Sequence, residues 1–151
     1  DQTPVSHAPV ELRAIAQECL ETLTPAAEKK GIAMTVEGPE TIVRGDRNSL
    51  WELIYNLMDN AIRYNRVNGS VEVRLSEHKV SVSDTGIGIA REHQERIFER
   101  FYRVDKSHSR ATGGTGLGLS IVKHVAERHG ARISLESTVG VGTTITVEFP
   151  E

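Results

Sequence analysis

Val71-Glu-Val-Arg-Leu75 alternates apolar and polar residues, and after a turn near Glu77-His78 the stretch Val80-Ser-Val-Ser83 does the same. This period of two is typical of strands with one buried and one solvated face. The two stretches therefore predict a β-hairpin. Residues 133–135 and 144–149 flank a glycine-containing turn and predict a second pair of strands.

Three segments carry apolar residues at the three- and four-residue spacing of a helix face. The first covers 10–23, and Pro25 is expected to kink or break it before Gly31 ends it. The second follows Asp46, which can cap it, and the third covers 117–128.

Two further strand candidates, 32–36 and 41–44, lie on either side of Gly38-Pro39. Helices set among strands that mostly pair as hairpins predict an α+β fold. We expect a two-layer α/β sandwich, with a mixed, mostly antiparallel sheet of about five strands and three helices on one face. The polar, glycine-containing run 103–115 is expected to form a flexible lid.

The length of 151 residues fits one domain, so we expect 1–8 to be a linker remnant and 9–151 to form that domain. A formal net charge of −3 favours no nucleic-acid partner. Cys19 lies among apolar residues at helical spacing, as expected for a buried thiol in a reducing compartment. Because no stretch approaches about 18 apolar residues, we expect no membrane span.

Glu52, Asn56, Asn60 and Arg63 follow one stripe of the second helix, because positions three and four apart stack on a helix. Asparagine is a weak helix former, so two in mid-helix need an explanation. One is a solvated polar flank. The other is that the amide oxygen of Asn60 binds Mg²⁺, which prefers oxygen ligands, while Arg63 faces phosphate.

Asp84 has the strand parity of two core valines, so its carboxylate is expected to need a donor. It can simply accept N–H bonds from the Thr85-Gly86 turn. Alternatively, it accepts the exocyclic amine of adenine while Gly86 and Gly88 let the ring approach the backbone.

A glycine-rich loop opens the third helix, an arrangement that directs free N–H groups and the positive end of a helix dipole at phosphate. No Lys-Ser/Thr pair follows, so this is not a Walker loop. Basic residues in the preceding segment are either solvated or suited to an anionic ligand. The loop glycines and these basic residues are Gly113, Gly114, Gly116, Gly118, Arg103, Lys106 and Arg110.

In their order, these segments resemble the N, G1, F, G2 and G3 boxes of the catalytic ATP-binding domain of sensor histidine kinases. The resemblance covers essentially the whole chain, and five boxes in sequence make it highly specific. The boxes are Asn56-Leu-Met-Asp-Asn-Ala-Ile-Arg-Tyr-Asn65, Asp84-Thr-Gly-Ile-Gly-Ile89, Ile97-Phe-Glu-Arg-Phe-Tyr-Arg103, Gly114-Thr-Gly-Leu-Gly-Leu119 and Gly140-Val-Gly-Thr143.

The resemblance implies a kinase that binds ATP and Mg²⁺ and transfers the γ-phosphoryl group to a histidine on a separate dimerisation domain. It implies a response regulator as an indirect partner and a cytoplasmic location, as part of a membrane receptor. It assigns Asn60 to the metal, Asn56 and Arg103 to catalysis, and Phe98 and Phe101 to anchoring the lid. The nucleotide-binding residues that it implies are Asn56, Asn60, Arg63, Tyr64, Asp84, Gly86, Gly88, Ile89, Arg103, Gly114, Thr115, Gly116, Leu117, Gly118 and Leu119.

The family's phosphoacceptor histidine is followed by an acidic residue, and none of the six histidines here is. We therefore expect the acceptor domain to be absent. In the gyrase, chaperone and mismatch-repair branch, a glutamate three residues before Asp-Asn-Ala acts as general base, and this position is Asn56 here. Because an amide cannot accept that proton, the site should hold ATP for transfer without rapid hydrolysis.

Two alternatives remain open at this stage. One is a degenerate or regulatory nucleotide-binding module, or an anti-sigma-type protein serine kinase, from the same superfamily. The other is an aspartic protease, because Asp84-Thr85-Gly86 also matches that signature. The long helices and the second glycine at Gly88 argue against the protease.

Overall fold

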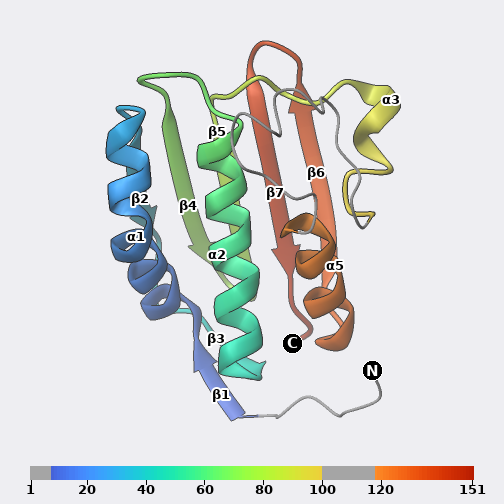
Figure 1. The fold of residues 1–151 in the computed structure, drawn as a ribbon. Coiled ribbons are helices and arrows are strands. Elements are labelled where there is room, and N and C mark those ends of the chain that lie inside the picture. Colours follow the sequence, from blue (N-terminus) through green and yellow to red (C-terminus); the bar gives the residue numbers. More distant parts are fainter. Residues whose placement is uncertain (1–7, 100–117) are drawn as a thin grey trace.

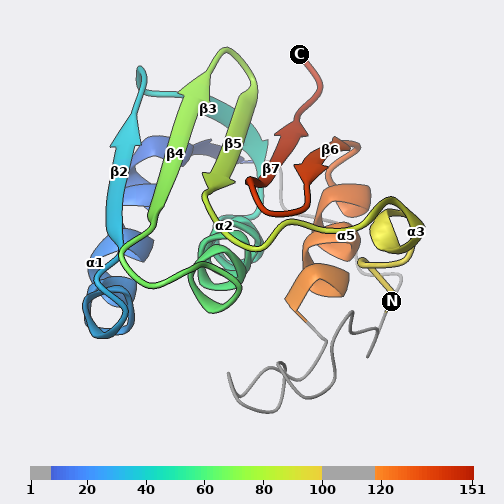
Figure 2. The same ribbon diagram turned by 90° about the horizontal axis from the view of Figure 1, so that it is seen from above.

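The computed structural model describes residues 8–99 and 118–151. Five strands form one sheet in the order β2-β4-β5-β7-β6, and helices α1, α2 and α5 cover one of its faces (Figure 1). From above, the sheet and the helices form two layers (Figure 2). The predicted fold class is thus confirmed. The elements are β1 (Ala8–Glu11), α1 (Leu12–Lys29), β2 (Ala33–Glu37), β3 (Ile42–Gly45), α2 (Arg47–Arg63), β4 (Ser70–Ser76), β5 (Lys79–Asp84), α3 (Arg91–Gln94), α5 (Gly118–Arg128), β6 (Arg132–Thr138) and β7 (Gly142–Glu148).

The sheet is mixed, and antiparallel pairs dominate it. β4, β5, β7 and β6 are antiparallel neighbours, whereas β2 pairs with β4 in parallel. At its centre, Val82 pairs with both Val73 and Ile145. The parallel pair needs a crossover connection, which runs through β3 and α2.

A second, two-stranded sheet joins β1 to β3. The sequence placed Val10 in the first helix, and this is wrong: Val10 belongs to β1, and the helix begins at Leu12. The boundary lies here because the Glu11 side chain caps the helix, accepting bonds from the N–H groups of Arg13 and Ala14 at 2.7 and 3.2 Å.

Helix α1 continues through Pro25 to Lys29, so the proline does not break it as expected. Leu23 and Ala27, on either side of Pro25, are buried and hold this turn of the helix on the core. Pro25 itself is exposed, and its missing N–H therefore leaves a carbonyl that water can reach. Gly31 follows with a φ of 70°, the left-handed conformation expected after a helix end.

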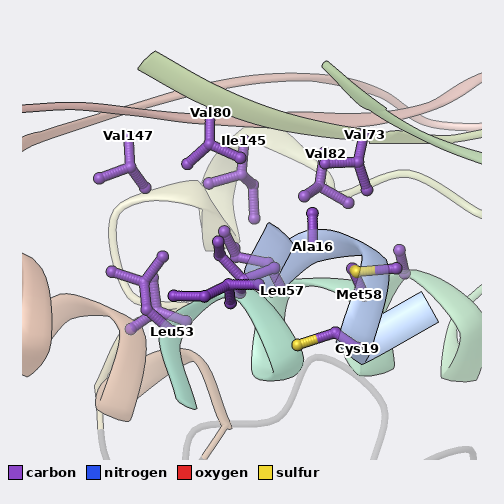
Figure 3. Close-up of a cluster of buried hydrophobic side chains, with 14 of the residues drawn as sticks. Ala16, Cys19, Leu53, Leu57, Met58, Val73, Val80, Val82, Ile145 and Val147 are labelled. Atoms are coloured by element: carbon purple, nitrogen blue, oxygen red, sulfur yellow. The ribbon is translucent and has the colours of Figure 1, made fainter. Parts of the chain in front are cut away.

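The core lies between the helices and one face of the sheet. Figure 3 shows Val73, Val80 and Val82 of the sheet directed toward the helix layer, which contributes Leu53 and Leu57. Cys19 is buried, as expected, and burial raises the pKa of its thiol to about 12. Within residues 8–99 and 118–151, no helix is long and apolar enough to cross a bilayer.

Helix α2 begins as the sequence predicted. The carboxylate of Asp46 accepts bonds from the N–H and hydroxyl of Ser49, at 2.9 and 2.8 Å. These bonds hold the pKa of Asp46 below its ordinary value. All seven buried residues of the helix are apolar, and they are Leu50, Leu53, Ile54, Leu57, Met58, Ala61 and Ile62. The cap thus fixes where the helix begins, and the apolar stripe determines which side faces the sheet.

Candidate functional site

Three parts of the chain meet at one end of the sheet: the end of α2, the segment after β5, and the turn between β6 and β7 (Figure 1). Backbone hydrogen bonds join them. Ile87 N–H donates to the Tyr64 carbonyl at 3.1 Å, and Gly140 N–H donates to the Ile87 carbonyl at 2.9 Å. The predicted adenine-binding segment 84–89 is therefore held between a helix end and a turn.

Asp84 is the last residue of β5 and is half-buried. Its Oδ1 accepts N–H bonds from Gly86 at 2.8 Å and from Thr143 at 3.3 Å. Burial raises the pKa of the Asp84 carboxyl above its ordinary value, and these two bonds offset part of the rise. Within residues 8–99 and 118–151, no hydrogen bond ends on Oδ2. One carboxylate oxygen thus holds the turn, while the other can accept a donor from a ligand.

The two glycines after Asp84 lie where a side chain would collide with backbone. A Cβ at Gly86 would come within 2.3 Å of the Tyr64 carbonyl oxygen, and one at Gly88 within 2.2 Å of the Thr138 carbonyl oxygen. Gly88 also has a φ of +75°. The half-buried Ile89 follows, and its N–H donates to Ser137 Oγ at 2.7 Å. The glycines therefore let the segment pack between its two neighbours, which fixes the backbone beside Asp84.

Asn56 and Asn60 lie one turn apart on α2. Asn56 Nδ2 donates to the Glu52 carbonyl at 2.7 Å. Its Oδ1 faces the start of α5, since a Cβ at Gly118 would lie 3.3 Å from this oxygen. Asn60 is half-buried, and its amide makes no hydrogen bond to the described residues. Of the polar stripe, Asn56 thus faces the first residue of α5.

Arg63 and Tyr64 end the same helix. Arg63 Nε donates to Asp59 Oδ2 at 2.8 Å, one turn earlier. Tyr64 is the C-cap, and its N–H bonds to the Asn60 carbonyl at 3.2 Å. The backbone of Tyr64 therefore joins the asparagine stripe to the segment after Asp84.

Part of the predicted site lies outside the described residues, because 100–117 are not described. The structure does describe Gly118, the first residue of α5, and Leu119, which is 9% exposed and packs in the core. Phe98, expected to anchor the lid, is partly buried against the same core. The site residues outside the description are Arg103, Gly114, Thr115, Gly116 and Leu117, together with the lid residue Phe101.

The sequence analysis quoted Asn65 in the N box without giving it a role, and it did not single out Arg66. Asn65 is 4% exposed, and its side chain donates to the Ser70 carbonyl at 2.9 Å and accepts from Thr85 Oγ1 at 3.2 Å. Arg66 Nη2 donates to the carbonyls of Gly86 at 3.2 Å and Gly140 at 2.7 Å. Its place at the end of the quoted N box is the local signal for Asn65. The partners of Arg66 are distant in sequence, so nothing local points to it.

Residues 45–151 match the protein family described as histidine kinase-, DNA gyrase B- and HSP90-like ATPase. The chain belongs to this family. The match covers the second helix and everything that follows it, including every segment of the site. The predicted resemblance is confirmed, and the family and fold favour it over the aspartic protease alternative.

Relatives within the family are sensor histidine kinases. The chain is 46% identical over 149 residues to the sensor-like histidine kinase SenX3 of Mycolicibacterium smegmatis, covering 94% of the chain and 38% of that protein. It is 44% identical over 115 residues to the sensor histidine kinase RppB of Synechocystis, covering 74% of the chain and 25% of RppB. The chain thus spans less than half the length of these relatives.

Solved structures place the chain among the catalytic domains of such kinases. The mycobacterial sensor histidine kinase MprB matches with a TM-score of 0.83 and 29% identity, over 95% of this chain and 97% of that one. The catalytic domain of histidine kinase ThkA matches with a TM-score of 0.78 and 26% identity, over 96% and 95% of the two chains. The chain accordingly has the fold of a histidine-kinase catalytic domain.

Proposed function

We propose that this ATPase-family domain binds Mg-ATP beside Asp84 and donates the γ-phosphoryl group to a histidine on a separate dimerisation domain. The observation that carries the proposal is the half-buried Asp84 carboxylate, whose Oδ1 is held by two backbone N–H groups while Oδ2 accepts none from the described residues. A relative supports nucleotide binding. ShkA, solved at full length in complex with AMPPNP, matches with a TM-score of 0.80 and 29% identity, over 99% of this chain and 32% of that one.

In this proposal, Asp84 Oδ2 accepts the exocyclic amine of adenine. The ring lies against the backbone at Gly86 and Gly88, with Ile89 and Tyr64 beside it. An ionised carboxylate suits this role because adenine presents an N–H donor at that position. Asp84 thus selects the base.

The phosphates would lie between α2 and the start of α5. Arg63 and Arg103 would supply positive charge, and the N–H groups of 114–119 would cradle the oxygens. Asn56 faces Gly118 across this space, so it can orient a phosphate oxygen but cannot take a proton from water. The arrangement therefore favours transfer to an acceptor over hydrolysis.

Asn60 fits the role of a magnesium ligand. Its amide is half-buried and bonded to none of the described residues, and it lies one turn from Asn56 on the phosphate-facing stripe. Mg²⁺ takes oxygen donors and usually binds through one or two protein groups together with phosphate oxygens and water. When bound, the ion would neutralise charge on the phosphates.

The partners follow from the family rather than from this chain. The acceptor histidine would belong to the dimerisation domain of the parent kinase, and a response regulator would receive the phosphoryl group from there. The location that we propose is the cytoplasmic portion of a membrane-bound receptor.

Asn60→Ala tests the metal assignment. The variant should weaken binding of ATP in the presence of Mg²⁺ by about tenfold, because one oxygen ligand is lost. Calorimetric titration with ATP, with and without Mg²⁺, measures the effect. Asn48→Ala is the matched control, since this exposed asparagine lies in the first turn of the same helix.

The control should bind Mg-ATP as the unmodified chain does. If Asn60→Ala binds Mg-ATP as tightly as Asn48→Ala, Asn60 does not hold the metal.

A further inference from the structure

Lys30 follows the last residue of α1, and its side chain reaches the end of α2. Its Nζ donates to the carbonyls of Ile62, Arg63 and Asn65, each at 3.0 Å. An ammonium group has three N–H donors, so these carbonyls use all of them. The side chain that follows the first helix thus binds the carbonyls at the end of the second.

A cation is favourable at the C-terminal end of any helix. The last carbonyls of a helix lack partners within the helix and carry partial negative charge, so a cation at this end is stabilising. Lys30 is half-buried, and burial lowers the pKa of its ammonium group. The three carbonyls replace the water that this ammonium loses on burial.

These bonds lie on either side of a peptide that belongs to the site. The carbonyls of Arg63 and Asn65 flank that of Tyr64, which accepts the N–H of Ile87 at 3.1 Å. A Cβ at Gly86 would lie only 2.3 Å from the same Tyr64 oxygen, so the two segments are in close backbone contact. The position of the Tyr64 carbonyl therefore sets that of the backbone after Asp84.

A second set of contacts ties the same turn to that backbone. Asn65 Oδ1 accepts from Thr85 Oγ1 at 3.2 Å, and Thr85 Oγ1 in turn accepts the Ser70 N–H at 2.9 Å. The Asn68 N–H also donates to the Lys30 carbonyl at 2.8 Å. The turn that carries Lys30 and the loop that carries Asn65 thus form one hydrogen-bonded unit.

We propose that Lys30 is a positioning residue of the nucleotide site, which fixes the Tyr64 peptide and, through it, the Gly86-Ile87 backbone. Lys30 touches no ligand in this account. It sets the surface against which the adenine ring rests and the distance from that surface to Asp84. The proposal rests on the proposed function in that its consequence is nucleotide affinity.

Lys30→Met removes the three donors and keeps an apolar side chain of similar length. Lys29→Met is the matched control, because Lys29 is the exposed last residue of α1. Calorimetry measures the dissociation constant of Mg-ATP at a temperature where circular dichroism shows each variant to be folded. Nitrogen-15 NMR without nucleotide follows the Ile87 amide, which a purely structural role of Lys30 would leave in place.

Lys30→Met should weaken Mg-ATP binding by about tenfold, and the Ile87 amide resonance should move and exchange faster with solvent. Lys29→Met should leave both unchanged. If Lys30→Met lowers only the melting temperature, and affinity and the Ile87 amide match the control, Lys30 merely stabilises the fold and the proposal fails.

Two further outcomes are covered, and the first distinguishes failure of this proposal from failure of the proposed function. If the unmodified chain binds no Mg-ATP, the proposed function fails, while the Ile87 amide still decides whether Lys30 positions this backbone. If Lys30→Met does not fold, Lys30→Gln, which keeps two N–H donors on a shorter side chain, is compared with Lys29→Gln by the same two measurements.

Discussion

In the proposed function, the Asp84 carboxylate has two tasks: Oδ1 holds the turn, and Oδ2 accepts the adenine amine. The strand ends at this residue, and Gly142 approaches so closely that a Cβ there would lie 2.0 Å from the Asp84 carbonyl oxygen. That close approach brings Thr143 N–H to Oδ1 and completes the pair of bonds begun by Gly86. The orientation of the carboxylate is therefore set before any ligand arrives.

Asp84→Asn should weaken ATP binding and narrow the preference for ATP over GTP. Guanine presents a carbonyl where adenine presents an amine, so an ionised Asp84 would face a second acceptor. An unpaired buried acceptor costs about 1–3 kcal/mol, which corresponds to roughly tenfold or more in affinity. Asparagine can turn its amide to donate to guanine. Calorimetry with both nucleotides checks this, and an unchanged ATP-to-GTP ratio would reduce Asp84 to a turn residue.

Asp84 should also make the free domain less stable as pH rises. Burial raises its pKa in the folded state above the ordinary value of 3.8. Between the ordinary pKa and the raised pKa of the folded state, the folded chain holds a proton that the unfolded chain releases. In this pH range, Asp84 therefore makes the free energy of unfolding fall as pH rises. Asp84→Asn removes this proton. From about pH 3.5 to about pH 7, the urea midpoint of the unmodified chain should fall relative to that of the variant. Equal slopes would contradict this expectation.

At the scale of elements, α2 is the structural axis of the site. It starts at the Asp46 cap, carries Asn56 and Asn60 on one stripe, and ends at the turn that Lys30 closes. Its apolar face fixes its rotation against the sheet. Asp46 therefore binds the N–H groups at the start of this helix, and Lys30 binds the carbonyls at its end.

Asp46→Ala should lower the free energy of unfolding by about 1 kcal/mol, the usual effect of losing an N-cap acceptor. Urea denaturation measures this. Asp46→Asn keeps an oxygen that can accept the Ser49 N–H. It should therefore lower the free energy of unfolding by less than half as much as Asp46→Ala does. Equal losses in the two variants would show that the charge of Asp46, and not its cap bond, stabilises the helix.

The sequence predicted those elements whose signals are local. The Asp46 cap, the three long helices and the hairpins β4-β5 and β6-β7 each depend on neighbouring residues, and each was found. The β1-β3 pairing and the parallel β2-β4 pairing were not predicted, because both join segments separated by a helix. The four-residue α3 was also missed, since it has no side-chain cap and no buried residue.

The residues of the candidate site divide in the same way. Motif positions such as Asn60 and Asp84 could be named from their order along the chain. The side-chain bonds of Lys30 span at least 32 positions, and Arg66 reaches Gly140 across 74 positions. No pattern in the sequence marks such partners, because folding alone brings them together.

As a whole molecule, the chain would carry out one half of the proposed two-part reaction. Its family, its fold and the site beside Asp84 all favour a nucleotide-binding phosphoryl donor. The six histidines lack the sequence context of the acceptor. Of these, His129 is buried, with Nδ1 2.8 Å from the Val125 carbonyl and Nε2 accepting the Asp46 N–H at 3.1 Å, so it serves the fold.

Incubation with Mg²⁺ and ATP labelled at the γ-phosphate, with and without a separate histidine-bearing dimerisation domain, tests the central claim most directly. We predict acid-labile label on the histidine of that domain, none on the chain alone, and much less transfer by Asn60→Ala. Stable label on the chain alone, or acid-stable label on a serine of the added domain, would contradict the account.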